Sequence, residues 1–272
     1  MRLTDYEKGA SKEIEAWRSD GVSMLQQLFH TAMKPVDWLV EQVIPANLID
    51  QASEGIAGFL ALLNNASEWT YDESDLLAEA TNAGLDISTI ADLQECDLEV
   101  LDKLAKSSVN ENALLAAIEG GGTGLGGAAL IIADIPLLFT INFRLIQQVG
   151  SAYGFSMKSP EFQPLVLSIF NVASSGSPAS KSDALREMSV AAAAFAHSTE
   201  YRGRRVSGTF SDQQRHLPRE IAKNLIGHKL GQMIPLAGAA VGAGINYWFT
   251  IQAAEASYML FRALYIERKE RL

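Results

Sequence analysis

The chain has 272 residues, of which 48% are hydrophobic and 20% charged, so it is long and apolar enough to fold around a core of its own. A formal net charge of −10 argues against nucleic acid binding by bulk electrostatics, and a single cysteine excludes a disulfide framework. That cysteine, Cys96, stands among acidic residues that raise a thiol pKa, so a reactive thiolate is not expected. The first 18 residues contain no apolar signal segment, which predicts residence in the cytoplasm.

The N-terminal third is predicted to be helical. Residues 5–18 place Tyr6, Ala10, Ile14 and Trp17 on one stripe of a helix, and residues 47–64 form a second helix. Alanine and leucine are abundant and no long alternating β-branched run occurs, so the same preference extends over the whole chain. The predicted fold class is therefore all-α, a multi-helix bundle around a glycine-rich hydrophobic helical hairpin.

The acidic segment, residues 71–112, holds eleven acidic and two basic residues, a net charge of −9. Gly84 is expected to end a first helix there, Ser88 to cap a second, and Asp97 to precede a third with leucines inward and acids outward. Charge and hydropathy together predict three parts: N-terminal helices (1–70), the acidic helical segment (71–112) and a hydrophobic helical core (113–272). Residues 201–231 carry a net charge of +5. This basic stretch either pairs with the acidic face inside the fold or meets an anionic surface.

Two long apolar blocks, residues 120–157 and 230–254, dominate the C-terminal half. Each is long enough to span a bilayer, for which roughly 20 residues suffice. The charged Asp134 in the first block and the alanine-rich, glycine-rich composition of the second favour a buried helical hairpin instead. Both readings stay open. Residues 174–182 are rich in serine and glycine and predict a loop, followed by an alanine-rich helix over 183–198.

Polar residues inside the apolar blocks are the first candidates for a functional site. An ionised group in an apolar setting is costly unless it is paired, so Asp134 and Arg144 should each have a partner. Ten residues apart on a helix, they lie about 15 Å from each other and are not expected to pair directly. Asn246, Glu255 and Arg262 are candidate partners. The predicted set of buried polar residues is Glu119, Asp134, Asn142, Arg144, Asn246 and Arg262.

Glycines spaced by four residues predict closely packed helices, as in the GxxxG motif. The close-packing candidates are Gly120, Gly124, Gly126, Gly238 and Gly242. Gly122, Gly124 and Gly127 also match a dinucleotide-binding fingerprint, but the run before them reads as helix rather than strand and no lysine follows. A nucleotide site is therefore not expected.

The sequence contains none of the catalytic or metal-binding motifs that we searched for by residue spacing. The histidines at 30, 197, 216 and 228 form neither an HExxH motif nor an i,i+4 pair, and no nucleophile elbow occurs. We therefore expect no metal and no cofactor, and we assign no catalytic residue. The sequence favours a non-enzymatic protein over an enzyme without deciding between them.

An amphipathic helix with a basic face is predicted over residues 215–233. The sequence places Leu217, Ile221 and Leu225 on one side, and its membrane-surface candidates are Arg215, Arg219, Lys223 and Lys229. Such a helix either lies on an anionic membrane or packs its apolar side on the core.

These residues, in this order, resemble the EcsC family of bacterial proteins over most of the chain. The resemblance rests on Tyr6-Glu7 with Ala10, Glu13, Ile14 and Trp17; on Asp92-Leu93, Asp97-Leu98-Glu99 and Asp102; on Glu119-Gly120, Thr123-Gly124, Gly126-Gly127, Asp134-Ile135-Pro136, Asn142, Arg144 and Tyr153-Gly154; and on Lys229-Leu230, Gln232, Ile234-Pro235, Gly238-Ala239, Gly242, Asn246, Ala254 and Arg262. It implies a helical protein without an established activity, whose namesake is encoded beside an ABC transporter, and it supplies no catalytic residue.

The leading functional prediction is a non-enzymatic accessory or scaffold protein, peripheral to or partly inserted in the inner membrane at its cytoplasmic face. Its expected partners are the membrane surface or a membrane protein such as an ABC transporter, a second copy of the chain being a further option. Two alternatives remain. One is a soluble helical protein that holds an apolar small molecule or lipid, and the other is a hydrolase in which Asp134 or Glu119 lies beside Arg144.

Overall fold

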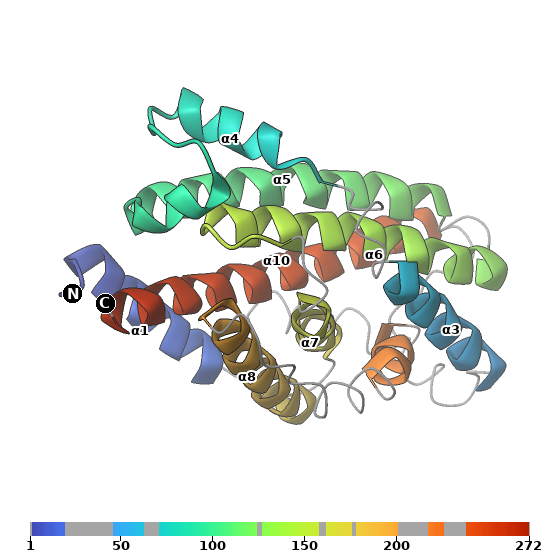
Figure 1. The fold of residues 1–272 in the computed structure, drawn as a ribbon. Helices are drawn as coiled ribbons and strands as arrows, with labels where there is room; N and C mark the ends of the chain where they lie inside the picture. The colour runs from blue at the N-terminus through green and yellow to red at the C-terminus, as the bar shows by residue number, and fades with distance from the viewer. Residues whose placement is uncertain are drawn as a thin grey trace.

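The computed structural model describes residues 2–19, 46–62, 71–123, 127–157, 162–175, 178–200, 217–225 and 238–271. This described part is built of helices and contains no strand, in agreement with the predicted all-α class. The helices, labelled as in Figure 1, are α1 (Asp5–Ser19), α3 (Ala46–Leu62), α4 (Glu73–Asn82), the 3-10 helix η2 (Ile90–Glu95), α5 (Leu98–Thr123), α6 (Gly127–Ala152), α7 (Gln163–Ser174), α8 (Pro178–Glu200) and α10 (Gly238–Arg271). Residues 217–225 are also helical.

Three long helices, α5, α6 and α10, form the body of the molecule (Figure 1). α5 and α6 are an antiparallel hairpin, and α10 runs antiparallel to α5, since its Asn246 meets Glu119 and its Arg262 meets Asp102. α4 covers one side of α5 and α6, while α3 packs on α6 and α7 packs on both α8 and α10. α1 packs on α10, which brings the two ends of the chain together (Figure 1).

Aromatic side chains fill the centre of the bundle. Phe139 of α6, Phe170 of α7 and Phe249 of α10 are fully buried, with ring centroids 4.4 to 6.0 Å apart. Phe59 of α3 meets Phe139 edge-on at 6.0 Å. Such ring pairs add roughly 0.5–1.5 kcal/mol each beyond the area that they bury. They fix the register of α3, α6, α7 and α10.

Several predicted helices are confirmed with small shifts at their ends. The helix predicted over 5–18 is α1, and the helix predicted over 47–64 is α3. Ala10, Ile14 and Trp17 of the predicted stripe of α1 are buried, but Tyr6 is 40% exposed. The alanine-rich helix is α8, which begins earlier than predicted.

Two local predictions were wrong. The loop expected over 174–182 is shorter, because α7 continues to Ser174 and α8 begins at Pro178, where proline suits the first turn of a helix. The cap of η2 is Thr89 rather than Ser88, with Asp92 accepting from the backbone N–H groups of both residues. Pro136 lies inside α6, which continues through it.

The predicted division at residue 112 falls inside a continuous helix. α5 begins among the acidic residues and ends among the glycines, so the acidic segment and the hydrophobic core share it. Of the predicted close-packing glycines, Gly120 is buried in α5 and Gly238 and Gly242 lie in α10, whereas Gly124 and Gly126 lie outside the described residues. A glycine-packed hairpin therefore stays a prediction. Among the described helices, none has the length and apolar character that crossing a bilayer requires.

Candidate functional site

Three predicted polar residues meet where the α5–α6 hairpin faces α10. The side-chain amide of Asn246 donates to Glu119 Oε2 at 3.0 Å and to Asp134 Oδ1 and Oδ2 at 3.3 and 3.4 Å. Asn246 and Asp134 are buried, and Glu119 is half-buried. The expectation that Asn246 supplies a partner to Asp134 is confirmed. An amide nitrogen carries two donors, which is why one asparagine can serve two carboxylates inside an apolar bundle.

Asn142, the predicted candidate in the middle of α6, bridges to α10. Its amide donates to the carbonyl oxygen of Leu138 at 2.8 Å and to Thr250 Oγ1 at 3.1 Å. All three residues are fully buried. This contact ties two helices together and leaves no opening to solvent for a ligand.

The sixth candidate, Arg262, belongs to a buried ion-pair cluster at the other end of α10. Its guanidinium contacts Asp102 Oδ2 at 3.0 Å and Glu13 Oε2 at 2.8 Å. Asp102 also accepts hydrogen bonds from the hydroxyls of Tyr6, at 2.7 Å, and Tyr153, at 2.6 Å. Asp102 and Arg262 are only 1% and 2% exposed, so the prediction that the acids after Asp97 all point outward was wrong for Asp102.

Two tyrosine hydroxyls and the guanidinium of this Asp102–Arg262 cluster stay protonated. Burial and the Asp102 carboxylate raise the pKa of Tyr6 to about 12, and the same causes raise the pKa of Tyr153 well above its ordinary value. Burial opposes the charge on Arg262, but Glu13 and Asp102 still raise its pKa. The hydroxyls therefore remain donors and the guanidinium remains charged. These contacts pin α1, α5, α10 and the end of α6 together.

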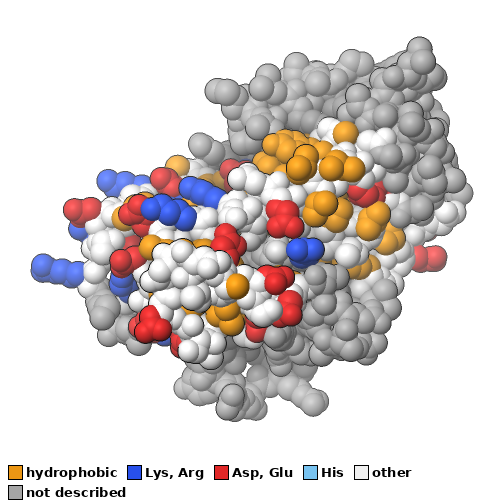
Figure 2. Space-filling view, turned by 90° about the horizontal axis from the view of Figure 1, so that it is seen from above, with side chains coloured by type: hydrophobic (Ala, Val, Ile, Leu, Met, Phe, Trp, Pro, Cys, Tyr) orange, Lys and Arg blue, Asp and Glu red, His pale blue; other side chains and the backbone are white. Residues whose placement is uncertain are grey.

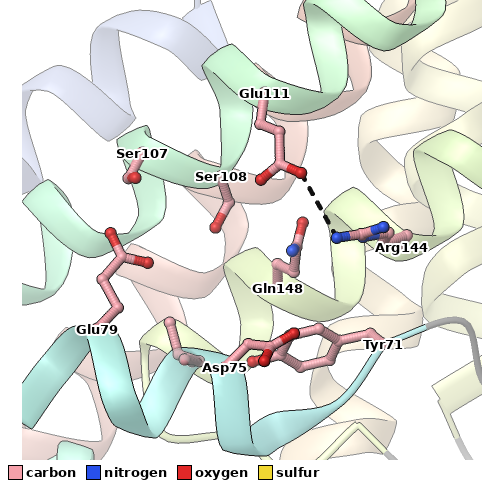
Figure 3. A pocket seen from close by; sticks show the side chains of 9 residues that line it. Tyr71, Asp75, Glu79, Ser107, Ser108, Glu111, Arg144 and Gln148 are labelled. Carbon is pink, nitrogen blue, oxygen red and sulfur yellow. Dashed lines mark ion pairs between the residues drawn. The ribbon is translucent and has the colours of Figure 1, made fainter.

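Arg144 lines a polar pocket of about 280 Å³ between α4, α5 and α6 (Figure 3). Its Nη2 lies 3.5 Å from Glu111 Oε1, so Arg144 does not pair with Asp134, as expected, but its partner is not one of the predicted candidates. For the hydrolase alternative, the expected structural hint was Asp134 or Glu119 beside Arg144, and the ion pair of Arg144 is with Glu111 instead. The other lining residues are Tyr71, Asp75, Leu76, Glu79, Ser107, Ser108 and Gln148. We call this cavity the α4 pocket.

An exposed apolar ridge runs along the outer face of α5. Leu114, Leu115 and Ile118 are 63%, 42% and 66% exposed, and Ile118 stands three residues after Leu115 and four after Leu114, which places all three on one side of the helix. Figure 2, which looks down on this side of the molecule, shows hydrophobic side chains gathered there. Single exposed leucines are ordinary, but a contiguous group marks an interaction surface. We call these three residues the α5 ridge.

Of the basic helix predicted over 215–233, the structure describes residues 217–225, which pack their apolar side into the core. Leu217, Ile221 and Leu225 are fully buried, so this face is not available to a membrane. Arg219 and Lys223 are exposed, and Arg219 pairs with Asp50 at 3.2 Å. Arg215 and Lys229 lie outside the described residues.

Glu255 gives a pH-dependent prediction. Burial raises the pKa of its carboxyl above the ordinary 4.5, although Lys181 opposes the shift. A raised folded pKa means that the ionised group costs stability at neutral pH and that the cost disappears in acid. Glu255→Gln should therefore raise the free energy of unfolding at pH 7 and have no such effect near pH 3. Urea melts at both values, with exposed Glu270→Gln as the control, test this; an equal gain at both would contradict it.

Comparison with known protein families and curated proteins gives the same family for this chain. The EcsC protein family model matches residues 8–266, and the chain belongs to this family. It is 32% identical to Protein EcsC of Bacillus subtilis (strain 168) over 68% of this chain and 72% of that protein. It is 22% identical to Uncharacterized protein YdbA of the same strain over 92% of this chain and 89% of that protein. No solved structure matches the chain.

Proposed function

We propose that this EcsC-family chain is a membrane-associated accessory protein that rests on the cytoplasmic face of the inner membrane through the α5 ridge. The observation that carries the proposal is the exposure of Leu114, Leu115 and Ile118 on one helix face. The opposite face of α5 is packed on the core through buried Leu101, Ala105 and other residues, so the helix presents the ridge without unfolding.

The chemistry of the ridge favours lipid over a protein partner. Energetically dominant positions of protein interfaces are enriched in tryptophan, tyrosine and arginine, whereas leucine is under-represented. The ridge is purely aliphatic. Acyl chains accept an aliphatic surface without demanding a complementary pocket. A transporter in the same membrane is the partner that the family resemblance implies, and the ridge would hold the protein near it.

The ridge alone is a weak anchor. Full burial of a leucine or isoleucine contributes about 1.5–3 kcal/mol, so three half-exposed side chains contribute roughly 3 kcal/mol, or about 100-fold in partitioning. Stable attachment needs a second contact. The 201–231 stretch is basic by sequence, and each basic residue near an anionic surface adds about 1 kcal/mol.

Flotation with lipid vesicles tests the proposal. Leu114→Glu with Ile118→Glu is expected to reduce binding to vesicles at least tenfold, because two charges replace the apolar contact. Val190→Glu is the matched control, since Val190 is 50% exposed on α8. Melting curves should show all variants folded.

Varying the salt concentration and the lipid composition of the vesicles distinguishes the contact made by the ridge from the contact made by the basic stretch. Ridge binding should persist on zwitterionic vesicles at high salt, whereas the basic contribution should need anionic lipid and weaken with salt. Equal flotation of wild type and the double variant would refute the ridge. A change in sedimentation without any vesicle binding would show that the ridge joins two copies instead.

A further inference from the structure

The α4 pocket holds two carboxylates that no basic residue of the described part of the chain neutralises. Asp75 and Glu79 stand four residues apart on α4 and both line the pocket. Within the described part of the chain, neither forms an ion pair, while the one guanidinium among the lining residues, Arg144, forms its ion pair with Glu111. Like charges at this spacing repel each other. The pocket therefore carries unbalanced negative charge toward its α4 side.

The floor of the pocket offers unused hydrogen-bonding groups. Gln148 and Ser108 are 7% and 6% exposed. Asn112 donates to Gln148 Oε1 at 2.7 Å, which fixes the amide and leaves its Nε2 as the open donor. Among the described residues, neither this nitrogen nor the Ser108 hydroxyl has a protein partner. Figure 3 shows Gln148 projecting from α6 into the space beside Arg144 and Glu111.

These groups divide the pocket into two chemically different ends. Donors from Gln148, Ser108 and Arg144 suit a carboxylate, because a guanidinium has five N–H groups and the 3.5 Å ion pair with Glu111 does not occupy them all. Asp75 and Glu79 suit ammonium groups. A volume of about 280 Å³ lies below the usual range for drug-sized ligands and fits an amino acid better than a nucleotide or lipid.

From this arrangement we infer that the α4 pocket binds a small zwitterion of the amino-acid class, with cationic members preferred. The carboxylate of the ligand lies at Gln148, Ser108 and Arg144, and its ammonium groups lie at Asp75 and Glu79. Because α4 supplies one wall, the bound ligand holds α4 against α5 and α6. This site is separate from the α5 ridge and does not depend on the proposed membrane contact.

Calorimetric titration of the full chain, without vesicles, tests the inference with L-lysine as the probe. Lysine should give saturable one-site binding, and the double variant Asp75→Asn with Glu79→Gln should bind it at least tenfold more weakly. Ser108→Ala should weaken binding several-fold. Asp86→Asn is the matched control, because Asp86 is an exposed carboxylate of the same segment that does not line the pocket.

Two comparison compounds test the two ends separately. Cadaverine, which lacks the carboxylate, and L-glutamate, which adds a negative charge, should both bind at least tenfold more weakly than lysine. Hydrogen exchange should show that lysine protects residues 73–82. Absence of saturable lysine binding, equal binding by the Asp75/Glu79 variant, or cadaverine binding as tight as that of lysine would overturn the inference.

Discussion

Replacing Arg262 by methionine is expected to lower the free energy of unfolding by about 3–5 kcal/mol, as removal of one partner of a buried ion pair does elsewhere. Asp102 is only 1% exposed, and the substitution leaves its carboxylate buried without the cation that it pairs with. The substitution also removes the partner of Glu13. The stacking of the guanidinium on the Tyr258 ring, 4.7 Å from its centroid, is lost as well. Urea denaturation followed by circular dichroism measures the change.

Two control variants make this result interpretable. Lys103→Met removes an exposed ion pair with Glu99 on the same α5 helix and should change stability by less than about 1 kcal/mol. Asp102→Leu combined with Arg262→Met leaves no buried charge unpaired and should cost less than the sum of the single changes. A loss below about 1 kcal/mol for Arg262→Met would contradict the view that this cluster pins the bundle.

Gly154→Ala is expected to destabilise the protein by about 2–5 kcal/mol, because two costs act together. Gly154 follows the end of α6 with φ +82°, a conformation that side chains rarely adopt. A Cβ atom there would also lie 2.7 Å from the backbone nitrogen of Gln94. Since Gln94 donates its amide to the Gly154 carbonyl at 2.7 Å, neither segment can move away without losing that bond.

Gly84→Ala isolates the conformational cost. Gly84 ends α4 with φ +89°, but nothing lies within 4 Å of the position that a Cβ would take. This variant should lose about 1–2 kcal/mol only. Thermal or urea melts of both variants measure the difference, and equal losses would show that the contact with Gln94 contributes nothing.

The sequence predicted helices well because their signal is local. The stripe of Ala10, Ile14 and Trp17 and the cap at Gly84 are short-range features, and both are confirmed. Helix ends next to serine and proline were predicted less well. The 174–182 stretch has the composition of a loop, yet packing of α8 on α7 overrides that preference after Pro178.

The polar residues were predicted individually but not as groups. Asn246 with Asp134 followed from the cost of an unpaired buried charge. Asp102 was missed, although it stands four residues after Leu98 and three before Ala105, on the stripe that α5 buries. The α4 pocket joins residues more than 60 positions apart, which spacing along one helix cannot reveal. The α5 ridge could have been detected from the sequence. All six residues 113–118 are apolar, which is more than a helix with one buried stripe requires.

The most direct test of the membrane proposal is the environment of the ridge itself. A cysteine placed by Ile118→Cys in a Cys96→Ser background can carry an environment-sensitive fluorophore, with Val190→Cys on α8 as the matched exposed position. On addition of vesicles, the probe at 118 should shift to the blue and be quenched by lipid-borne quenchers, while the probe at 190 stays in water. An unchanged spectrum at 118, or equal shifts at both positions, would contradict docking through α5.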